Sequence, residues 1–241
     1  MTAGFELVAR ANGVSEWRHR GNGLTVLVGP TPVAPVVAFG VVYRVGSRHE
    51  APGHTGATHL LEHLMFKGSA RYNRARGSEV ARELHRVGAI YNATTWLDRT
   101  NYYELLQATD DNLKWAIEME ADRMVNSFIR KSDLNTEFSV VRNEYEMGEN
   151  SPFSVLLKRL QSVAYDWHSY GRSTIGNRSD IENVKEENLQ AFYRKYYQPD
   201  NAVLLVAGKF DEAKALALIA DAFGNIPKPA RQLPEEWTVE P

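Results

Sequence analysis

Hydrophobic and polar positions along the chain follow two different spacings. Runs of β-branched and aliphatic residues predict strands, and the longest run, at 34–45, is typical of a central strand. Apolar residues three and four apart predict helices, as for Leu113 and Ile117 within 111–127. The predicted strands are 25–28, 34–45, 89–96, 100–108 and 202–207, and the predicted helices are 57–66, 79–87, 111–127, 132–148, 153–165, 186–197 and 211–223.

Strands and helices are mixed along the chain, and this mixture predicts an α+β fold with a largely antiparallel sheet. Only Leu97-Asp98-Arg99 separates two of the predicted strands, which indicates a hairpin. We expect residues 1–226 to form one domain. The tail at 227–241 contains four prolines and has the composition of the start of an interdomain linker.

Composition excludes several classes of protein. The 241 residues are 43% hydrophobic and 24% charged, with a net charge of -2, so nothing favours nucleic-acid binding. Cysteine is absent, which excludes disulfides and thiolate metal ligands. No apolar run approaches the roughly 18 residues of a membrane span. The N-terminus lacks the basic start and apolar run of a signal peptide, and the sequence does not fix the compartment.

The strongest chemical signal is the pentapeptide His59-Leu60-Leu61-Glu62-His63, the reverse of the H-E-x-x-H order. On a helix, His59 and His63 project from one face, with Cβ atoms roughly 6 Å apart. Two neutral imidazoles can bind one zinc ion, and the adjacent carboxylate can accept a proton from water. The alternative is a solvated helix. The apolar residues around the motif oppose that alternative, because a buried polar cluster needs partners or a metal.

A catalytic zinc site usually has three protein ligands. Glu137 and Glu144 are seven residues apart in a predicted helix and therefore share a face. One carboxylate can reach the metal while the other orients a ligand. Spacing alone does not say which is which, and it gives equal weight to both being surface carboxylates.

Seven short stretches, spread over nearly the whole chain, carry a further pattern: GSRHE (46–50), GATHLLEHLMFKG (56–68), NATT (92–95), TNYY (100–103), VRNEY (141–145), YGRSTIG (170–176) and YQPDNA (197–202). In this order they resemble the N-terminal domain of the pitrilysin/insulinase family of zinc peptidases, the inverzincins, which include insulin-degrading enzyme and mitochondrial processing peptidase. The resemblance implies a pitrilysin/LuxS-like metallohydrolase fold.

The resemblance also implies a role for each candidate residue. His59, His63 and Glu144 would bind Zn2+, and Glu137 would support them. Glu62 would be the general base that activates a zinc-bound water for attack on a peptide bond. The interval between the motif and Glu144 is longer than is typical of the family, and we place the extra residues in the loop at 71–77. Extra residues inside the helix of Glu137 would instead put the Glu144 assignment in doubt.

The family resemblance further assigns substrate binding to Asn92, Ala93 and Thr94. The corresponding family strand is a sheet edge that binds an extended peptide through main-chain hydrogen bonds. Without the resemblance, an ordinary hairpin strand is the better interpretation.

The resemblance implies a peptide substrate and a second family domain or subunit that closes a chamber. It favours a bacterial periplasmic or secreted location. The leading hypothesis is thus a zinc endopeptidase acting on peptides or unfolded segments. One alternative is a non-catalytic partner or scaffold subunit of the same family, and another is a metal-dependent hydrolase with a different substrate. The intact H-x-x-E-H motif counts against the non-catalytic alternative.

Overall fold

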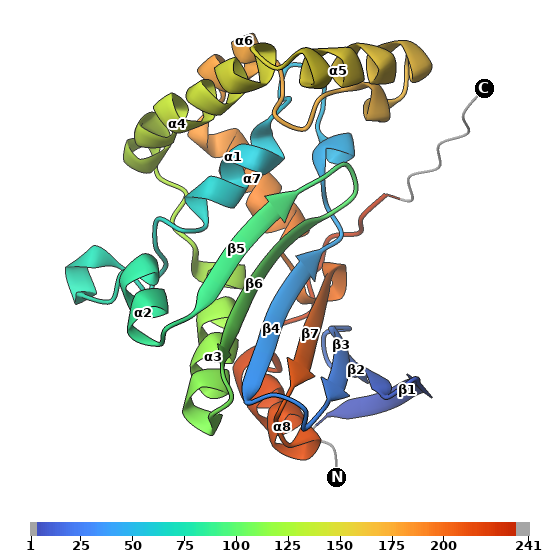
Figure 1. Ribbon diagram of the computed structural model, residues 1–241, viewed down its shortest axis with the longest axis vertical. Coiled ribbons are helices and arrows are strands. Elements are labelled where there is room, and N and C mark those ends of the chain that lie inside the picture. The colour runs from blue at the N-terminus through green and yellow to red at the C-terminus, as the bar shows by residue number, and fades with distance from the viewer. Residues whose placement is uncertain (1–3, 235–241) are drawn as a thin grey trace.

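A twisted seven-stranded sheet forms the centre of the computed structural model, which describes residues 4–234 (Figure 1). The strand order is β1-β2-β3-β7-β4-β6-β5, and every neighbouring pair is antiparallel except β3–β7. This arrangement confirms the predicted α+β class. The strands are β1 (Phe5–Ala11), β2 (Val14–His19), β3 (Thr25–Pro30), β4 (Val36–Tyr43), β5 (Ile90–Thr95), β6 (Thr100–Gln107) and β7 (Ala202–Gly208).

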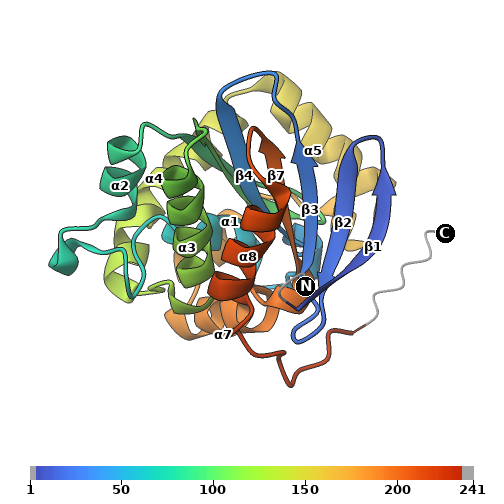
Figure 2. The same ribbon diagram turned by 90° about the horizontal axis from the view of Figure 1, so that it is seen from below.

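Helices cover one face of the sheet, with α3 and α8 side by side against it (Figure 2). Alternation along β4 creates the face that they cover, because Val37, Phe39, Val41 and Tyr43 point to one side and are each at most 1% exposed. The helices are α1 (Ala57–Leu64), α2 (Val80–Arg86), α3 (Asp110–Asn126), α4 (Lys131–Glu149), α5 (Pro152–Ala164), α6 (Arg178–Asn183), α7 (Glu186–Tyr196) and α8 (Glu212–Phe223).

Two features of the fold were not predicted from the sequence. The β1–β2 hairpin turns at Asn12 and Gly13, both with positive φ, and only Phe5 of β1 is buried. An edge strand with one buried residue shows no clear alternation, which explains the omission of β1. The short helix α6 lies in a segment for which no helix was predicted.

The proposed extra residues at 71–77 lie in a loop that buries Tyr72, is exposed at 74–77 and contains a short 3-10 turn, and α4 runs unbroken through Glu137 and Glu144. Residues 227–234 have no regular secondary structure, but Arg231 forms two hydrogen bonds to Asp200 of 2.7 and 2.8 Å. The remainder of the predicted linker, 235–241, lies outside the described residues. Within 4–234, no helix has the length and apolar character needed to cross a membrane.

A buried cation joins α3 to the sheet. Arg123 is fully buried and donates to Glu120 at 2.6 Å, with Glu104 of β6 3.8 Å away. Its guanidinium also lies 4.7 Å from the ring centres of both Phe66 and Tyr102. Burial and the nearby Glu120 raise the pKa of Glu104 well above its usual range, which favours a proton shared within this cluster.

We predict that Arg123→Met lowers the free energy of unfolding by about 3–5 kcal/mol, because it leaves Glu120 buried without its counter-charge. Urea denaturation followed by circular dichroism measures the change. The control is Lys214→Met, which removes an ion pair to Asp110 whose partners are 66% and 78% exposed. The control substitution should lower the free energy of unfolding by less than about 1 kcal/mol. Equal losses in the two variants would contradict the interpretation.

Candidate metal centre

Helix α1 is oriented by a buried carboxylate at its N-terminus. Glu50 accepts the backbone N–H of Gly56 at 2.9 Å and of Thr58 at 2.7 Å, which satisfies two donors that a helix start leaves open. Gly56 has a φ of 86°, and a Cβ there would collide with the carbonyl oxygen of Ile175. Burial raises the pKa of Glu50 to about 7 in spite of these hydrogen bonds. Further along α1, the buried aliphatic residues Leu60, Leu61 and Leu64 pack into the core.

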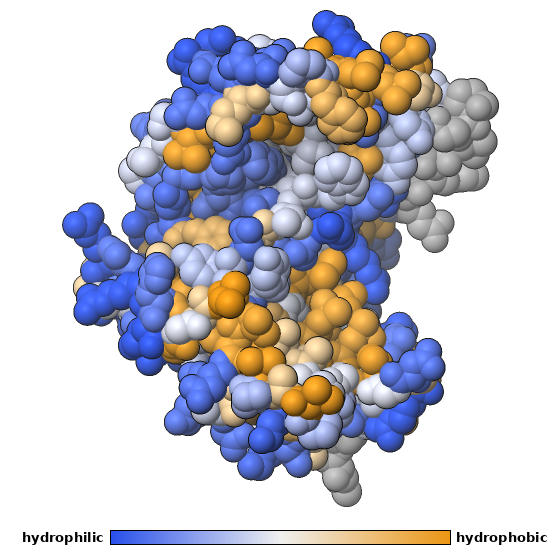
Figure 3. Space-filling model, in the orientation of Figure 1, coloured by the Kyte–Doolittle hydropathy of each residue, from blue (hydrophilic) through white to orange (hydrophobic). Residues whose placement is uncertain are grey.

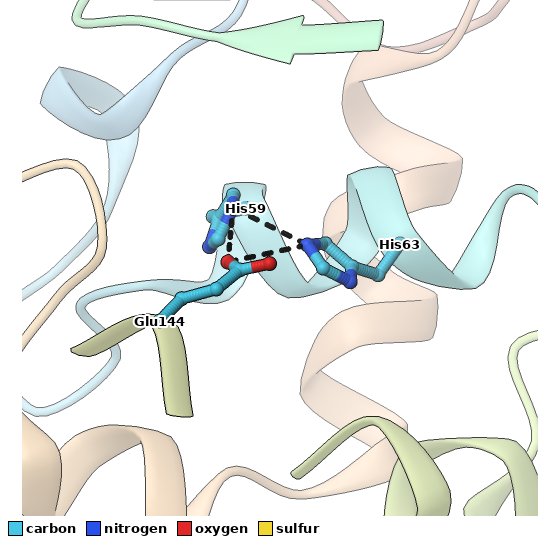
Figure 4. Close-up of side chains that lie close together, drawn as sticks. All are labelled: His59, His63 and Glu144. Atoms are coloured by element: carbon cyan, nitrogen blue, oxygen red, sulfur yellow. Dashed lines mark hydrogen bonds and ion pairs between the residues drawn. The ribbon is translucent and has the colours of Figure 1, made fainter. Parts of the chain in front are cut away.

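The opposite face of α1 presents two imidazoles to a carboxylate from α4 (Figure 4). The Nε2 atoms of His59 and His63 are 3.3 Å apart, and Glu144 Oε2 lies 3.4 Å from the first and 3.7 Å from the second. Two nitrogens that bind a tetrahedral zinc ion at about 2.0–2.1 Å are themselves about 3.3 Å apart. The three side chains therefore fit the geometry of a zinc ligand set.

The protonation state of His59 also suits metal binding. Burial, with the adjacent His63, lowers the pKa of His59 to about 4, so its ring is neutral near pH 7. A neutral imidazole is the form that binds a metal ion. Nδ1 of His59 is buried and has no hydrogen-bond partner among the described residues.

Glu137 lies outside this trio and supports it. Its Oε2 is 2.9 Å from Nδ1 of His63, and its Oε1 is 2.5 Å from Nζ of Lys67. Burial opposes ionisation of Glu137, but the bonds from Lys67 and His63 hold its pKa below the usual value. A carboxylate at this position keeps the proton on Nδ1 and leaves the Nε2 lone pair directed at the cluster.

Glu62 is buried beside the trio, and its carboxylate is held from the sheet. Oε2 accepts a 2.5 Å hydrogen bond from Oγ1 of Thr95, the last residue of β5. Burial raises the pKa of Glu62. Neither Thr95 nor Lys67 was predicted to be part of the site. The available signals were that Lys67 follows His63 by one helical turn and that Thr95 ends the NATT stretch.

The three predicted substrate-binding residues lie on an edge strand. β5 pairs only with β6, so its other edge is free of sheet partners among the described residues. This strand lies beneath α1 in the view of Figure 1. Asn92 and Thr94 are exposed, Ala93 is buried, and the backbone N–H of Ala93 donates to Oδ1 of Asn92 at 2.9 Å.

Two histidines on a buried helix, with a carboxylate from a helix that is distant in sequence, form the kind of centre that metal-dependent hydrolases use. A family model described as "Insulinase (Peptidase family M16)" matches residues 25–178. A second, described as "Peptidase M16 inactive domain", matches residues 183–241. The chain therefore belongs to the insulinase family, peptidase family M16. In the structure, β7 lies between β3 and β4, so the segments matched by the two models share one sheet.

Relatives and solved structures agree with this family. The chain is 31% identical over 223 residues to "Zinc protease PqqE" of Helicobacter pylori, covering 91% of this chain and 49% of that protein. It is 31% identical over 192 residues to "Uncharacterized zinc protease YmxG" of Bacillus subtilis, covering 80% of this chain and 46% of that protein. The solved structure of a protease from Helicobacter pylori superposes with a TM-score of 0.84 at 30% identity. The match covers 98% of this chain and 54% of that protease.

Pitrilysin shares the fold, with a TM-score of 0.81 at 24% identity over 98% of this chain and 26% of pitrilysin. The chain spans about half the length of the curated relatives it matches.

The raised pKa of Glu50 predicts a pH dependence of stability. The folded protein keeps a proton on Glu50 up to about pH 7, whereas the ordinary pKa of this group is 4.5. The folded state therefore binds more protons between these values, and this contribution to the free energy of unfolding decreases as pH rises through them.

Urea denaturation of wild type and Glu50→Gln, from about pH 5 to about pH 8, measures this contribution. The free energy of unfolding of wild type minus that of the variant should decrease as pH rises. A difference that is independent of pH would contradict it.

Proposed function

We propose that this chain carries the metal centre of a zinc endopeptidase that cleaves peptides or unfolded polypeptide segments. In this proposal His59, His63 and Glu144 hold Zn2+. The 3.3 Å separation of the two Nε2 atoms, with a carboxylate oxygen beside both, is the observation that carries the proposal. The relatives are named as zinc proteases, which supports the same metal.

The protein's own residues supply the proton transfers. When bound, Zn2+ is a Lewis acid that polarises a carbonyl group and makes water more acidic. Glu62 accepts a proton from the attacking water and later donates it to the leaving amine. Its burial-raised pKa suits both steps, because a carboxyl that titrates closer to neutral pH can accept a proton and then release it.

The free edge of β5 is the proposed substrate site. An extended peptide adding to this edge would lie along Asn92, Ala93 and Thr94 and form main-chain hydrogen bonds with Ala93, whose main-chain groups face the free edge. The N–H of Ala93 is a donor not used for pairing with β6, because it bonds to the side chain of Asn92. Recognition by main-chain groups favours unfolded segments over folded proteins and tolerates many sequences.

A second family domain or a partner subunit would complete the enzyme. The solved Helicobacter pylori protease and pitrilysin are longer chains, of which this chain covers 54% and 26% respectively. A closed chamber needs a second wall facing α1, α4 and the edge of β5. The alternative, a non-catalytic partner subunit, has no need of a buried general base hydrogen-bonded beside three convergent ligand atoms.

Two substitutions separate metal binding from proton transfer. We predict that Glu144→Gln weakens zinc binding by more than about 100-fold, since even supporting residues change affinity by 10- to 100-fold. Glu62→Gln should retain zinc, and turnover of an unstructured peptide should fall by roughly 100-fold or more. Elemental analysis and chelator competition measure the metal, with activity assayed in this chain and in any longer polypeptide that contains it.

About one zinc per wild-type chain is expected. A folded wild type that takes up no zinc when supplied with it would reject the metal centre and favour the scaffold alternative. Full turnover in zinc-loaded Glu62→Gln would reject the role of Glu62 alone.

The edge-strand site predicts a specific effect of Ala93→Pro. Proline removes the N–H, and an edge strand tolerates it because that N–H does not pair with β6. Affinity for an uncleaved peptide, measured with Glu62→Gln, should fall roughly 3- to 10-fold, as expected for one hydrogen bond. Ala93→Ser, which keeps the N–H, is the control. Unchanged affinity in a folded Ala93→Pro protein would rule out this site.

A further inference from the structure

The hydrogen bond between Thr95 and Glu62 joins two elements that are distant in sequence. Glu62 lies on α1, and Thr95 lies where β5 enters the hairpin to β6. A hydroxyl at the end of a strand can position a carboxyl on a helix only if the strand end is itself fixed. The hairpin tip, residues 96–99, therefore decides how firmly Glu62 is held.

The backbone of the tip is fixed against the loop that precedes α1. Ser47 and Arg48 donate their N–H groups to the carbonyl oxygens of Trp96 and Leu97, each at 3.0 Å. Gly46 lies so close that a Cβ there would collide with both of these carbonyl oxygens. This packing leaves little room for the tip to move towards the loop.

Side chains from three segments complete the attachment. Nε of Arg48 is 2.8 Å from Oδ1 of Asp98, and the hydroxyl of Tyr170 donates to the same carboxylate at 2.8 and 3.0 Å. We call Arg48, Asp98 and Tyr170 the tip clamp. The three residues of the tip clamp come from the loop before α1, the hairpin tip and the short turn after α5. They meet at the carboxylate of Asp98.

We propose that Thr95, held by the tip clamp, is a positioning residue that fixes the carboxyl group of Glu62 for proton transfer. This inference rests on the proposed function. The bond occupies Oε2 of Glu62 and leaves Oε1 to exchange a proton. Glu62 is 9% exposed, so little water is available to replace the hydroxyl if it is removed.

The arrangement also ties the general base to the proposed substrate strand. Asn92, Ala93 and Thr94 directly precede Thr95 on β5. A peptide that pairs with this edge therefore lies on the same strand that positions Glu62. Misplacing a catalytic group by even about 1 Å can reduce a rate by roughly 100-fold, so a fixed strand end has a large effect on turnover.

The test compares Thr95→Val, which keeps the shape and removes the hydroxyl, with Thr95→Ser, which keeps the hydroxyl. In the intact zinc-loaded protein, Thr95→Val should lower kcat roughly 10- to 100-fold, with KM and zinc content unchanged. Thr95→Ser should stay within about threefold of wild type. A kcat for Thr95→Val within about twofold of wild type, or an equal loss in both variants, overturns the proposal.

Two further measurements keep this inference distinct from the proposed function. In a Glu62→Gln background, Thr95→Val should add almost no further loss of kcat, because both changes act through one carboxyl group. A full additional loss would overturn the positioning role.

Crystal structures of Thr95→Val and Thr95→Ser give a readout independent of activity. The Glu62 carboxyl should leave its position in the first variant and keep it in the second. An unmoved Glu62 in Thr95→Val overturns the inference, even if the chain proves to be no peptidase.

Discussion

Fixed placement of α1 is the constraint on which the rest of the site depends. The buried carboxylate of Glu50 holds the first turn through two backbone N–H groups. Just beyond the last turn, Phe66 lies under the buried guanidinium of Arg123. With the apolar face of α1 packed into the core, the helix can neither rotate nor slide without exposing leucines or breaking a buried charge contact. Its polar residues therefore face α4 and β5 in one fixed direction.

The polar residues of that face meet two elements: both histidines meet α4, and Glu62 meets β5. Glu144 of α4 lies opposite the Nε2 atoms of the histidines, and Glu137, two turns earlier on α4, holds the far nitrogen of His63. Glu62 is held from β5 by Thr95. In the proposed metal centre, α4 alone would provide both the ligand and its support, because seven residues along a helix correspond to about 10 Å. The proposed base, Glu62, is held separately from the sheet, so in this proposal metal affinity and proton transfer would be open to independent adjustment.

The sequence predicts the local parts of this arrangement and not the long-range ones. Helix α1 and the facing of His59 and His63 follow from spacing within five residues, and the hairpin of β5 and β6 follows from alternation and a short turn. Spacing could not separate Glu137 from Glu144, since both lie on one face of α4. Their distinction depends on how far α4 is shifted along α1, which only tertiary packing determines. Thr95 was missed for the same reason, because its contact with Glu62 depends on the position of a sheet edge.

The converging atoms also bear on what a metal ion would do for the fold. Glu137 lies against Nδ1 of His63, and burial lowers the pKa of His59 to about 4, so the two Nε2 atoms and Oε2 of Glu144 can bring lone pairs to one point. A single proton can bridge only two of them, whereas a divalent cation can bind all three. Binding would add stability by mass action, about 2.7 kcal/mol at a hundred times the dissociation constant. Small zinc fingers need their metal to fold. Here the leucines of α1, Glu50 and Arg123 fix the helix through protein contacts, so the fold itself would organise the ligand set of the proposed metal centre.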